Sequence, residues 1–164
     1  MLFLVEANEK YTGELAQFKK EVLLYDKNRT DQFAGCMGLR DCSTEKDWIK
    51  LCNLRKRTET CEQAGTTVPS TTYFAIRESD NRLVGVIDLR HHIDHPILGT
   101  WGGHCGYSVR PSERGKGYAN EMLRLNIQNA KRMGLSKLLV VCDETNAASE
   151  KTILANGGVF EKYI

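Results

Sequence analysis

One stretch of the chain constrains the fold more than any other: residues 104–133, where the hydrophobic pattern changes from extended to helical across two glycines. The segment "HCGYSV" runs up to Pro111 and has the aromatic and β-branched residues of a strand. Gly115 and Gly117 follow it, and from Ala119 to Met133 the apolar residues recur at steps of three and four. The pattern predicts a strand, a tight glycine turn and an amphipathic helix that stops at Gly134.

Similar patterns predict the remaining elements. "LFLVEA" at the start is typical of a strand, and "TTYFAI" and "LVGVIDL" on either side of "ESDNR" indicate an antiparallel hairpin. "SKLLVVC" predicts a wholly buried strand because its apolar residues run without alternation, "NAASEKTILAN" predicts a short helix, and "VFEKYI" a final extended piece. Two further helices are expected from the spacing of Leu15, Phe18, Val22 and Tyr25, and from a cap at Ser43 or Thr44 followed by Trp48, Ile49, Leu51 and Cys52.

This order of elements predicts an α/β (α+β) fold in a single domain, residues 1–164. The sheet is expected to be mixed and mostly antiparallel, with helices flanking it and one right-handed βαβ crossover around the glycine turn. A chain of 164 residues can bury one sizeable core without metal or disulfide support.

Composition limits the kinds of partner. The net charge of +2 indicates no global attraction to nucleic acid or to a membrane. The apolar run at the N-terminus, "MLFLV", is too short for a signal peptide or a membrane span, so a cytoplasmic protein is expected. The six cysteines have no C-x-x-C spacing, and reduced, partly buried thiols are expected rather than disulfides.

The glycine turn can be compared with known anion-binding loops. A Walker loop needs a hydroxyl residue after Gly-Lys, but Gly117 follows Gly115 and Lys116. A dinucleotide fingerprint needs a third glycine, and Asn120 stands in that place. Two interpretations remain: a plain helix start with glycines for the turn, or a set of backbone N–H groups that converge on an anion.

With its flanks, the turn resembles the GNAT acetyltransferase superfamily. The signature of that family is [Q/R]-x-x-G-x-[G/A] after a strand that ends in V-x-P, and Arg114-x-x-Gly117-x-Ala119 after Val109-Arg110-Pro111 matches it. The resemblance extends more loosely from Tyr73 to the "ETNAAS" and "NGGVF" segments. It implies an acetyl-CoA-dependent N-acetyltransferase, in which acetyl-CoA is the co-substrate.

The resemblance also implies where the cofactor binds. The diphosphate of coenzyme A would lie on the backbone of the turn, and the pantetheine arm would pair with the preceding strand, whose N–H near Val109 would stabilise the oxyanion. Asn146 and Ser149, on the helix near the C-terminus, match two polar positions that line the cofactor in the family. Their alternative role is to cap that helix. The cofactor-binding residues expected in this way are Tyr107, Ser108, Val109, Arg114, Gly115, Lys116, Gly117, Tyr118, Ala119, Asn146 and Ser149.

The groups that would move protons depart from the family pattern. Many members have a tyrosine that protonates the departing thiolate, but its position here is Ile153. Many also have a carboxylate on the strand before the turn, and "WGGHCGYSV" has none. His104 and Asp88 are the candidate catalytic bases, whereas Cys142 is expected to be a buried thiol.

Other clusters carry weaker signals. His91, His92 and His95, with His104, match no common zinc spacing, so no metal site is expected. The run Arg55-Lys56-Arg57 is typical of a solvated helix end rather than of a nucleic-acid site.

The acceptor is expected to be the primary amine of a small molecule or a peptide, attacked directly in a ternary complex. In the family, residues equivalent to Asp31–Asp41 shape the acceptor pocket. The C-terminal strands look shortened, which a second copy of the chain could compensate by forming a homodimer. The alternative function is a non-catalytic acyl-CoA binding or sensing module, which the isoleucine at position 153 favours.

Overall fold

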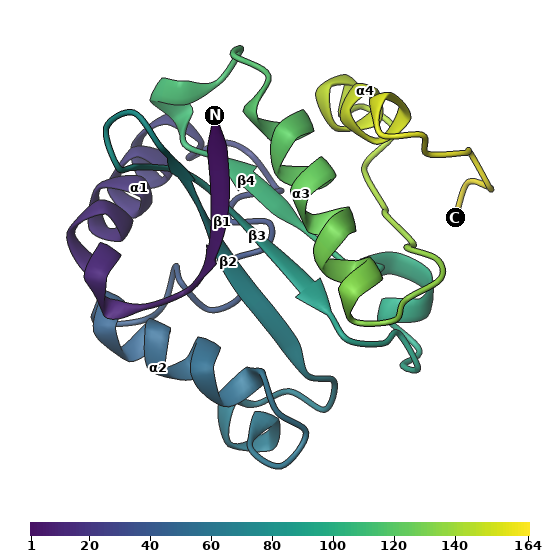
Figure 1. Ribbon diagram of the computed structural model, residues 1–164, viewed down its shortest axis with the longest axis horizontal. Coiled ribbons are helices and arrows are strands. Elements are labelled where there is room, and N and C mark those ends of the chain that lie inside the picture. The colour runs from purple at the N-terminus through teal and green to yellow at the C-terminus, as the bar shows by residue number, and fades with distance from the viewer.

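The computed structural model describes residues 1–164 as one antiparallel sheet with two helices on either side (Figure 1). The sheet has the strand order β1-β2-β3-β4, where β1 is Leu2–Glu6, β2 is Ser70–Arg77, β3 is Arg82–Arg90 and β4 is Tyr107–Val109. The helices are α1 (Thr12–Tyr25), α2 (Glu45–Arg55), α3 (Tyr118–Arg132) and α4 (Ala147–Ala155). The predicted class, a mostly antiparallel sheet flanked by helices, is confirmed. The sheet is not mixed, however, because all its strand pairs are antiparallel, and the expected βαβ crossover is wrong because no strand follows α3.

The alternating side chains of the hairpin divide the core into two faces. Phe74, Ile76 and Val86 pack under α1 and α2, and Ala75, Val84 and Ile87 pack under α3. In β2 the side chains alternate with the period of two expected of a strand, but in β3 Val84 and Val86 lie on opposite faces because a bulge shifts the register between Ala75 and Ile76. The sheet is thus covered on both faces at its centre, and its free parts are the outer edges of β1 and β4.

The helices begin and end close to their predicted positions. Thr44 caps α2 by accepting a hydrogen bond from the Asp47 N–H (3.1 Å). After α3, Gly134 has a φ of 88°, a left-handed conformation that favours glycine. Leu15, Phe18 and Val22 of α1 are buried as expected, but Tyr25 is 68% exposed because it is the last residue of the helix.

The expected strand at residues 136–142 is wrong. These residues form no strand, and from Leu138 to Cys142 they are only half-buried. They contact the sheet through His104, whose N–H donates to the Leu139 carbonyl (2.8 Å) and whose ring Nδ1 accepts from the Leu139 N–H (2.9 Å). The Leu139 N–H is thus bonded to the His104 ring rather than to a main-chain carbonyl of a neighbouring strand. No ladder of main-chain hydrogen bonds follows from this contact. The final piece, "VFEKYI", also forms no strand and is exposed.

The loop between α1 and α2 crosses the sheet beside β4. Gly35, with a φ of 78°, lies against Gly106, and a Cβ atom on Gly35 would stand 2.4 Å from the Gly106 carbonyl oxygen. Next to this contact, Ser108 Oγ donates to the Ala34 carbonyl (2.6 Å). The expected acceptor loop, Asp31–Asp41, is thereby held against the last strand of the sheet.

No helix of the structure combines the length and the apolar character needed to cross a membrane. All six cysteines are free thiols, and Cys36, Cys52, Cys61 and Cys105 are buried. Cys142, expected to be buried, is only partly covered.

The contact between the two glycines can be tested with a matched pair of substitutions. Gly35→Ala adds a side chain in a left-handed conformation and forces it into the Gly106 carbonyl, whereas Gly65→Ala, at the same φ of 78°, meets no atom within 4 Å. We expect Gly65→Ala to lower the free energy of unfolding by about 1–2 kcal/mol, the cost of that conformation, and Gly35→Ala to lower it by more. Urea unfolding measures both, and equal losses would contradict the close contact.

His104 should make stability depend on pH. Burial lowers the pKa of His104 below its ordinary value of 6.5, and the charges of Arg90 and His92 act in the same direction. The unfolded chain therefore takes up a proton that the folded chain does not, and stability is lost as pH falls below about 6.5. For each unit by which the pKa is lowered, the free energy of unfolding decreases at low pH by up to about 1.4 kcal/mol.

In His104→Asn, an amide oxygen can accept from the Leu139 N–H without titrating. We expect its free energy of unfolding to fall less than that of the wild type between pH 7.5 and pH 5.5. Burial also lowers the pKa of His91, but that contribution is common to both proteins and cancels in the comparison. Identical pH dependence of the two proteins would contradict the role given to the His104 ring.

Candidate active site

The glycine turn before α3 presents a row of unpaired backbone donors, which we call the cradle (residues 115–120). None of its six N–H groups donates to an acceptor in the protein. Gly115 and Gly117 have φ values of 78° and 81°, and neither has an atom within 4 Å of the place where a Cβ would stand. A helix start ordinarily leaves four donors free, and here the turn adds to them, beside the positive end of the helix dipole. The cradle therefore suits an anionic group such as a diphosphate.

The side chain of Arg114 anchors the cradle to the end of α1. Its two terminal nitrogens donate to the two carboxylate oxygens of Asp26 (2.7 and 2.6 Å), and its Nε donates to the Val109 carbonyl (3.1 Å). Asp26 is 4% exposed, whereas 34% of the Arg114 side chain is exposed, so this bidentate pair has its carboxylate shielded and its guanidinium partly open to solvent. The arginine of the sequence signature thus positions the turn with its side chain.

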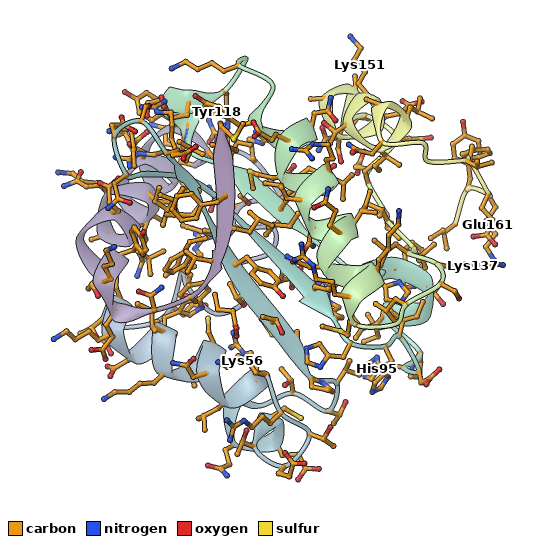
Figure 2. The ribbon with its side chains drawn as sticks, viewed as in Figure 1. Lys56, His95, Tyr118, Lys137, Lys151 and Glu161 are labelled. Atoms are coloured by element: carbon orange, nitrogen blue, oxygen red, sulfur yellow. The ribbon has the colours of Figure 1, made fainter.

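Glu113, a buried carboxylate just before the turn, holds the turn through hydrogen bonds to basic side chains. It accepts two hydrogen bonds from Arg77 (2.9 and 2.6 Å) and one from Lys116 (2.9 Å). Burial alone would raise the pKa of Glu113, but the bonds from Lys116 and Arg77 hold it below its ordinary value. Arg77 also donates to the hydroxyl of Tyr118 (3.2 Å). Tyr118, at the start of α3, is labelled in Figure 2.

Arg110 completes this support. It is 3% exposed, donates through Nε to Glu21 of α1, and donates to the Leu83 carbonyl of β3 (3.2 Å). The other oxygen of Glu21 accepts from the Ser112 N–H (3.0 Å). Sequence reasoning missed the roles of Asp26, Arg77, Arg110 and Glu113, because the partners that define them lie 27 to 89 residues away.

The outer edge of β4 offers two further free donors. The Asp88 N–H donates to the Gly106 carbonyl (3.0 Å), and the Arg110 N–H donates to the Val84 carbonyl (2.7 Å). Because residues of an antiparallel strand bond alternately to one side and the other, Tyr107 and Val109 turn their N–H groups away from β3. An extended chain could therefore pair with this edge.

Helix α4 lies alongside this edge and is fastened at both ends. At its start, Tyr107 and Ser149 share a hydrogen bond between their hydroxyls (2.6 Å). At its end, the Asn156 amide donates to the Asn120 side chain (2.7 Å), in the first turn of α3. Two expected cofactor residues, Tyr107 and Ser149, are thus brought together.

Asn146 lies at the same end of α4 as Ser149. Its side-chain oxygen accepts from the Ser149 N–H (3.1 Å), so it caps the helix. Its amide approaches the carboxylate of Asp31 in the α1–α2 loop (3.4 Å). The expected acceptor loop and the start of α4 therefore meet beside Tyr107.

The two candidate bases are occupied by structural contacts. The bond that His104 Nδ1 accepts from Leu139 places the ring proton of the neutral form on Nε2, which leaves the ring without a free lone pair. Asp88 is 4% exposed, and its Oδ1 accepts from the Gly106 N–H (2.6 Å). Burial raises the pKa of Asp88, with Arg90 and the Gly106 N–H opposing the rise. A catalytic role for either residue stays a prediction.

The remaining clusters form no site near the cradle. No group of three or more His, Cys, Asp or Glu side chains is arranged to hold a metal ion. Arg55 is not the solvated helix end that its sequence suggests, because it is 5% exposed and donates to the Met37 carbonyl (2.8 Å).

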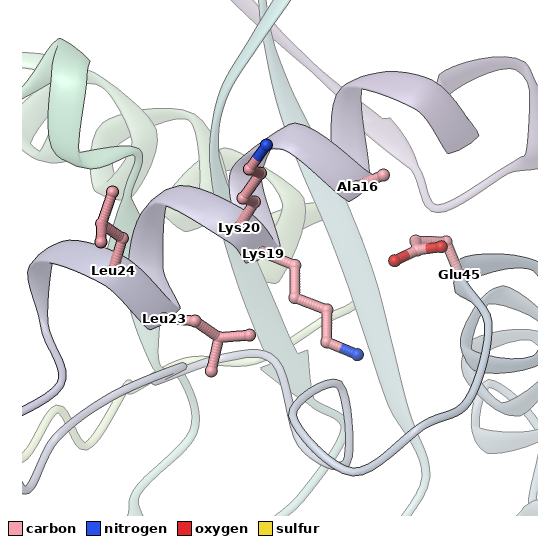
Figure 3. Close-up of a pocket in the computed structure, with 6 residues that line it drawn as sticks. All are labelled: Ala16, Lys19, Lys20, Leu23, Leu24 and Glu45. Atoms are coloured by element: carbon pink, nitrogen blue, oxygen red, sulfur yellow. The ribbon is translucent and has the colours of Figure 1, made fainter.

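A separate open groove of about 470 Å³ lies between α1 and α2 (Figure 3). Figure 3 labels the side chains that line it, which are Ala16, Lys19, Lys20, Leu23, Leu24 and Glu45. None of them touches the cradle, so this groove is distinct from the candidate active site.

Comparisons with known proteins agree with this arrangement. The acetyltransferase (GNAT) domain family matches residues 37–159. Comparison with curated proteins by sequence gives no match.

Several solved structures share the fold. The RimL ribosomal L7/L12 α-N-protein acetyltransferase with coenzyme A has a TM-score of 0.63 at 19% identity, over 94% of this chain and 78% of that chain. The microcin C7 self-immunity acetyltransferase MccE with acetyl-CoA and AMP has a TM-score of 0.60 at 20% identity, over 95% and 77%. An acetyltransferase from Salmonella typhimurium that modifies the N-terminal serine of L7/L12 has a TM-score of 0.59 at 20% identity, over 94% and 78%. The family match spans well over half of the sequence, and the chain belongs to the GNAT acetyltransferase family.

Proposed function

We propose that the protein transfers an acetyl group from acetyl-CoA to the primary amine of an acceptor, by direct attack in a ternary complex. The observation that carries this proposal is two sets of free donors, the cradle and the outer edge of β4, in a chain of the GNAT family. The cradle would bind the diphosphate of coenzyme A. Tyr107 and Val109 would pair with the pantetheine arm, which brings the thioester to the start of α4.

The fit of the cofactor rests on the cradle and on what surrounds it. Lys116 is the half-exposed cation nearest to its donors, with 50% of its side chain exposed, and it could approach a phosphate while keeping Glu113 within reach. Small residues at positions 115, 117 and 119 leave the backbone accessible. The N–H of Val109 would then stabilise the oxyanion that forms when the amine attacks.

The acceptor pocket would be formed by the α1–α2 loop, which lies against β4 at Gly35 and Ser108. Similar structures include enzymes described as acting on the α-amine of a ribosomal protein, which makes peptide α-amines the first acceptors to test. Small-molecule amines are the second class. A cytoplasmic location and a homodimer stay predictions.

A second candidate is a non-catalytic acyl-CoA binding or sensing module. Ile153 favours it, because an aliphatic side chain cannot protonate a thiolate where many members of the family have a tyrosine. Thiol release from acetyl-CoA, measured across a panel of peptide and small-molecule amines, separates the two functions. Release with any amine supports the enzyme, and binding without release on every amine supports the module.

Binding of coenzyme A tests the cradle itself. Gly117→Ala places a methyl group among the free donors, whereas Gly134→Ala introduces a similar left-handed residue (φ 88°) at the far end of α3. We expect calorimetry to show coenzyme A binding to the wild type and to Gly134→Ala, and at least about tenfold weaker binding to Gly117→Ala, or about 1.4 kcal/mol.

Urea unfolding checks that both substitutions cost similar stability, since each strains the backbone in the same way. Equal affinities in the two variants, or no heat with the wild type, would contradict the assignment of the cradle.

A further inference from the structure

Asp31 is the side chain of the α1–α2 loop that meets helix α4. Its Oδ2 lies 3.4 Å from the side-chain amide of Asn146, and the Asn146 side-chain oxygen accepts from the Ser149 N–H (3.1 Å). Ser149 in turn shares a hydrogen bond with Tyr107 of β4 (2.6 Å). Consecutive contacts therefore join Asp31 to the edge strand, although Asp31 and Asn146 are 115 positions apart in the sequence.

These contacts place Asp31 near the far end of the proposed cofactor path. The cradle adjoins the other end of β4, where Arg114 donates to the Val109 carbonyl (3.1 Å). An arm that runs from the cradle along β4 therefore reaches Tyr107 last, because Tyr107 begins this strand. The proposed function places the thioester there, so Asp31 lies where an acceptor would approach it.

Other polar side chains of the loop bond within it or are buried. Gln32 donates to the Asp26 carbonyl and accepts from Arg40 (3.1 Å). The Cys36 side chain is buried, at 1% exposed. The side chain of Asp31 is 41% exposed, so a ligand can reach it.

Arg29 holds the Asp31 carboxylate with two hydrogen bonds. Its Nε donates to one carboxylate oxygen (2.9 Å), and a terminal nitrogen donates to the other (2.7 Å). The Arg29 N–H donates to the Asp26 carbonyl (2.9 Å), and the Asp26 carboxylate binds Arg114 of the turn. The residue that anchors the cradle therefore also supports the pair of Arg29 and Asp31.

The Asp31 carboxylate can accept a further hydrogen bond. An ionised carboxylate has about four acceptor positions, and Arg29 and Asn146 approach three of them. The hydrogen bond from Arg29 holds the pKa of Asp31 below its ordinary value, so Asp31 is ionised at neutral pH. Because Arg29 also offsets its charge, Asp31 can accept from a neutral amine without strongly favouring the ammonium form, which has no lone pair for attack.

We propose that Asp31 binds the acceptor by accepting a hydrogen bond from an N–H of its primary amine, and that Arg29 positions the Asp31 carboxylate. This inference rests on the proposed function. The amine lies between Asp31 and the thioester, with its lone pair free to attack the carbonyl carbon. A primary amine suits this site because its nitrogen has one N–H to donate to Asp31 and another to lose when the amide forms.

Asp31→Ala and Asp31→Asn test the binding role. The assay uses acetyl-CoA with whichever amine of the panel the wild type acetylates. We expect KM for the amine to rise about tenfold or more in Asp31→Ala, with kcat and the affinity for coenzyme A changed less than about threefold, because the hydrogen bond is present before and during the attack. Asp31→Asn retains an acceptor oxygen and should raise KM less than Asp31→Ala does.

Arg29→Gln and its combination with Asp31→Ala test the positioning role. Because Arg29 acts through Asp31, Arg29→Gln should raise KM for the amine in the wild type and have little further effect in Asp31→Ala. Full additivity of the two effects would overturn the role given to Arg29.

Glu6→Ala is the matched control. It removes another exposed ion pair, that of Glu6 with Lys56 (3.1 Å), on β1 at the opposite edge of the sheet from β4. Exposed ion pairs contribute little to stability, so all these variants should unfold in urea close to the wild type. Glu6→Ala should keep the wild-type KM for the amine, and a rise in KM that it shares with Asp31→Ala would overturn the inference.

The outcomes distinguish this inference from the function on which it rests. Absence of coenzyme A binding by the wild type, or binding without thiol release on any amine, overturns the proposed enzyme and the inference with it. Turnover in the wild type with KM for the amine unchanged in Asp31→Ala overturns the inference alone. Weaker coenzyme A binding in Asp31→Ala, or a fall in kcat without a rise in KM, also overturns it.

Discussion

The site depends on a set of ion pairs around the turn before α3, each with one buried member. Arg110, Glu113 and Asp26 are each 3–4% exposed, and each has an oppositely charged partner within hydrogen-bond distance. Loss of a partner would leave the buried member without its counter-charge. These pairs therefore hold the turn before α3 against the rest of the protein, while its N–H groups stay unpaired.

In the proposed function, the backbone of the turn recognises the anion. The two cations of the turn are engaged elsewhere, Arg114 with Asp26 and Lys116 with Glu113. The net charge of the chain is only +2, so long-range attraction contributes little. Backbone N–H groups at a helix start carry partial positive charge, and their hydrogen bonds are directional. They therefore favour an anion of a particular shape at one position. That property suits a diphosphate followed by a neutral arm.

The polar side chains next to β4 serve as structural supports. His104 and Asp88 use their polar atoms to hold Leu139 and Gly106, and these bonds set the geometry at the base of β4. The hydroxyls of Tyr107 and Ser149 bond to each other and join β4 to α4.

The sequence by itself determined the features that depend on neighbouring residues. The 3.6-residue spacing of α1 and α3, the strand-forming residues and turn of the β2–β3 hairpin and the glycines at 115 and 117 were recognisable because periodicity, residue type and left-handed turns are local properties. Only the tertiary structure decided what depends on distant partners. Arg114 bonds to Asp26 across 88 positions, and His104 bonds to Leu139 across 35, which ends the strand expected at 136–142. The pairing of Tyr107 with Ser149 has the same origin, since no local pattern specifies which side chains the packed helices and strands bring together.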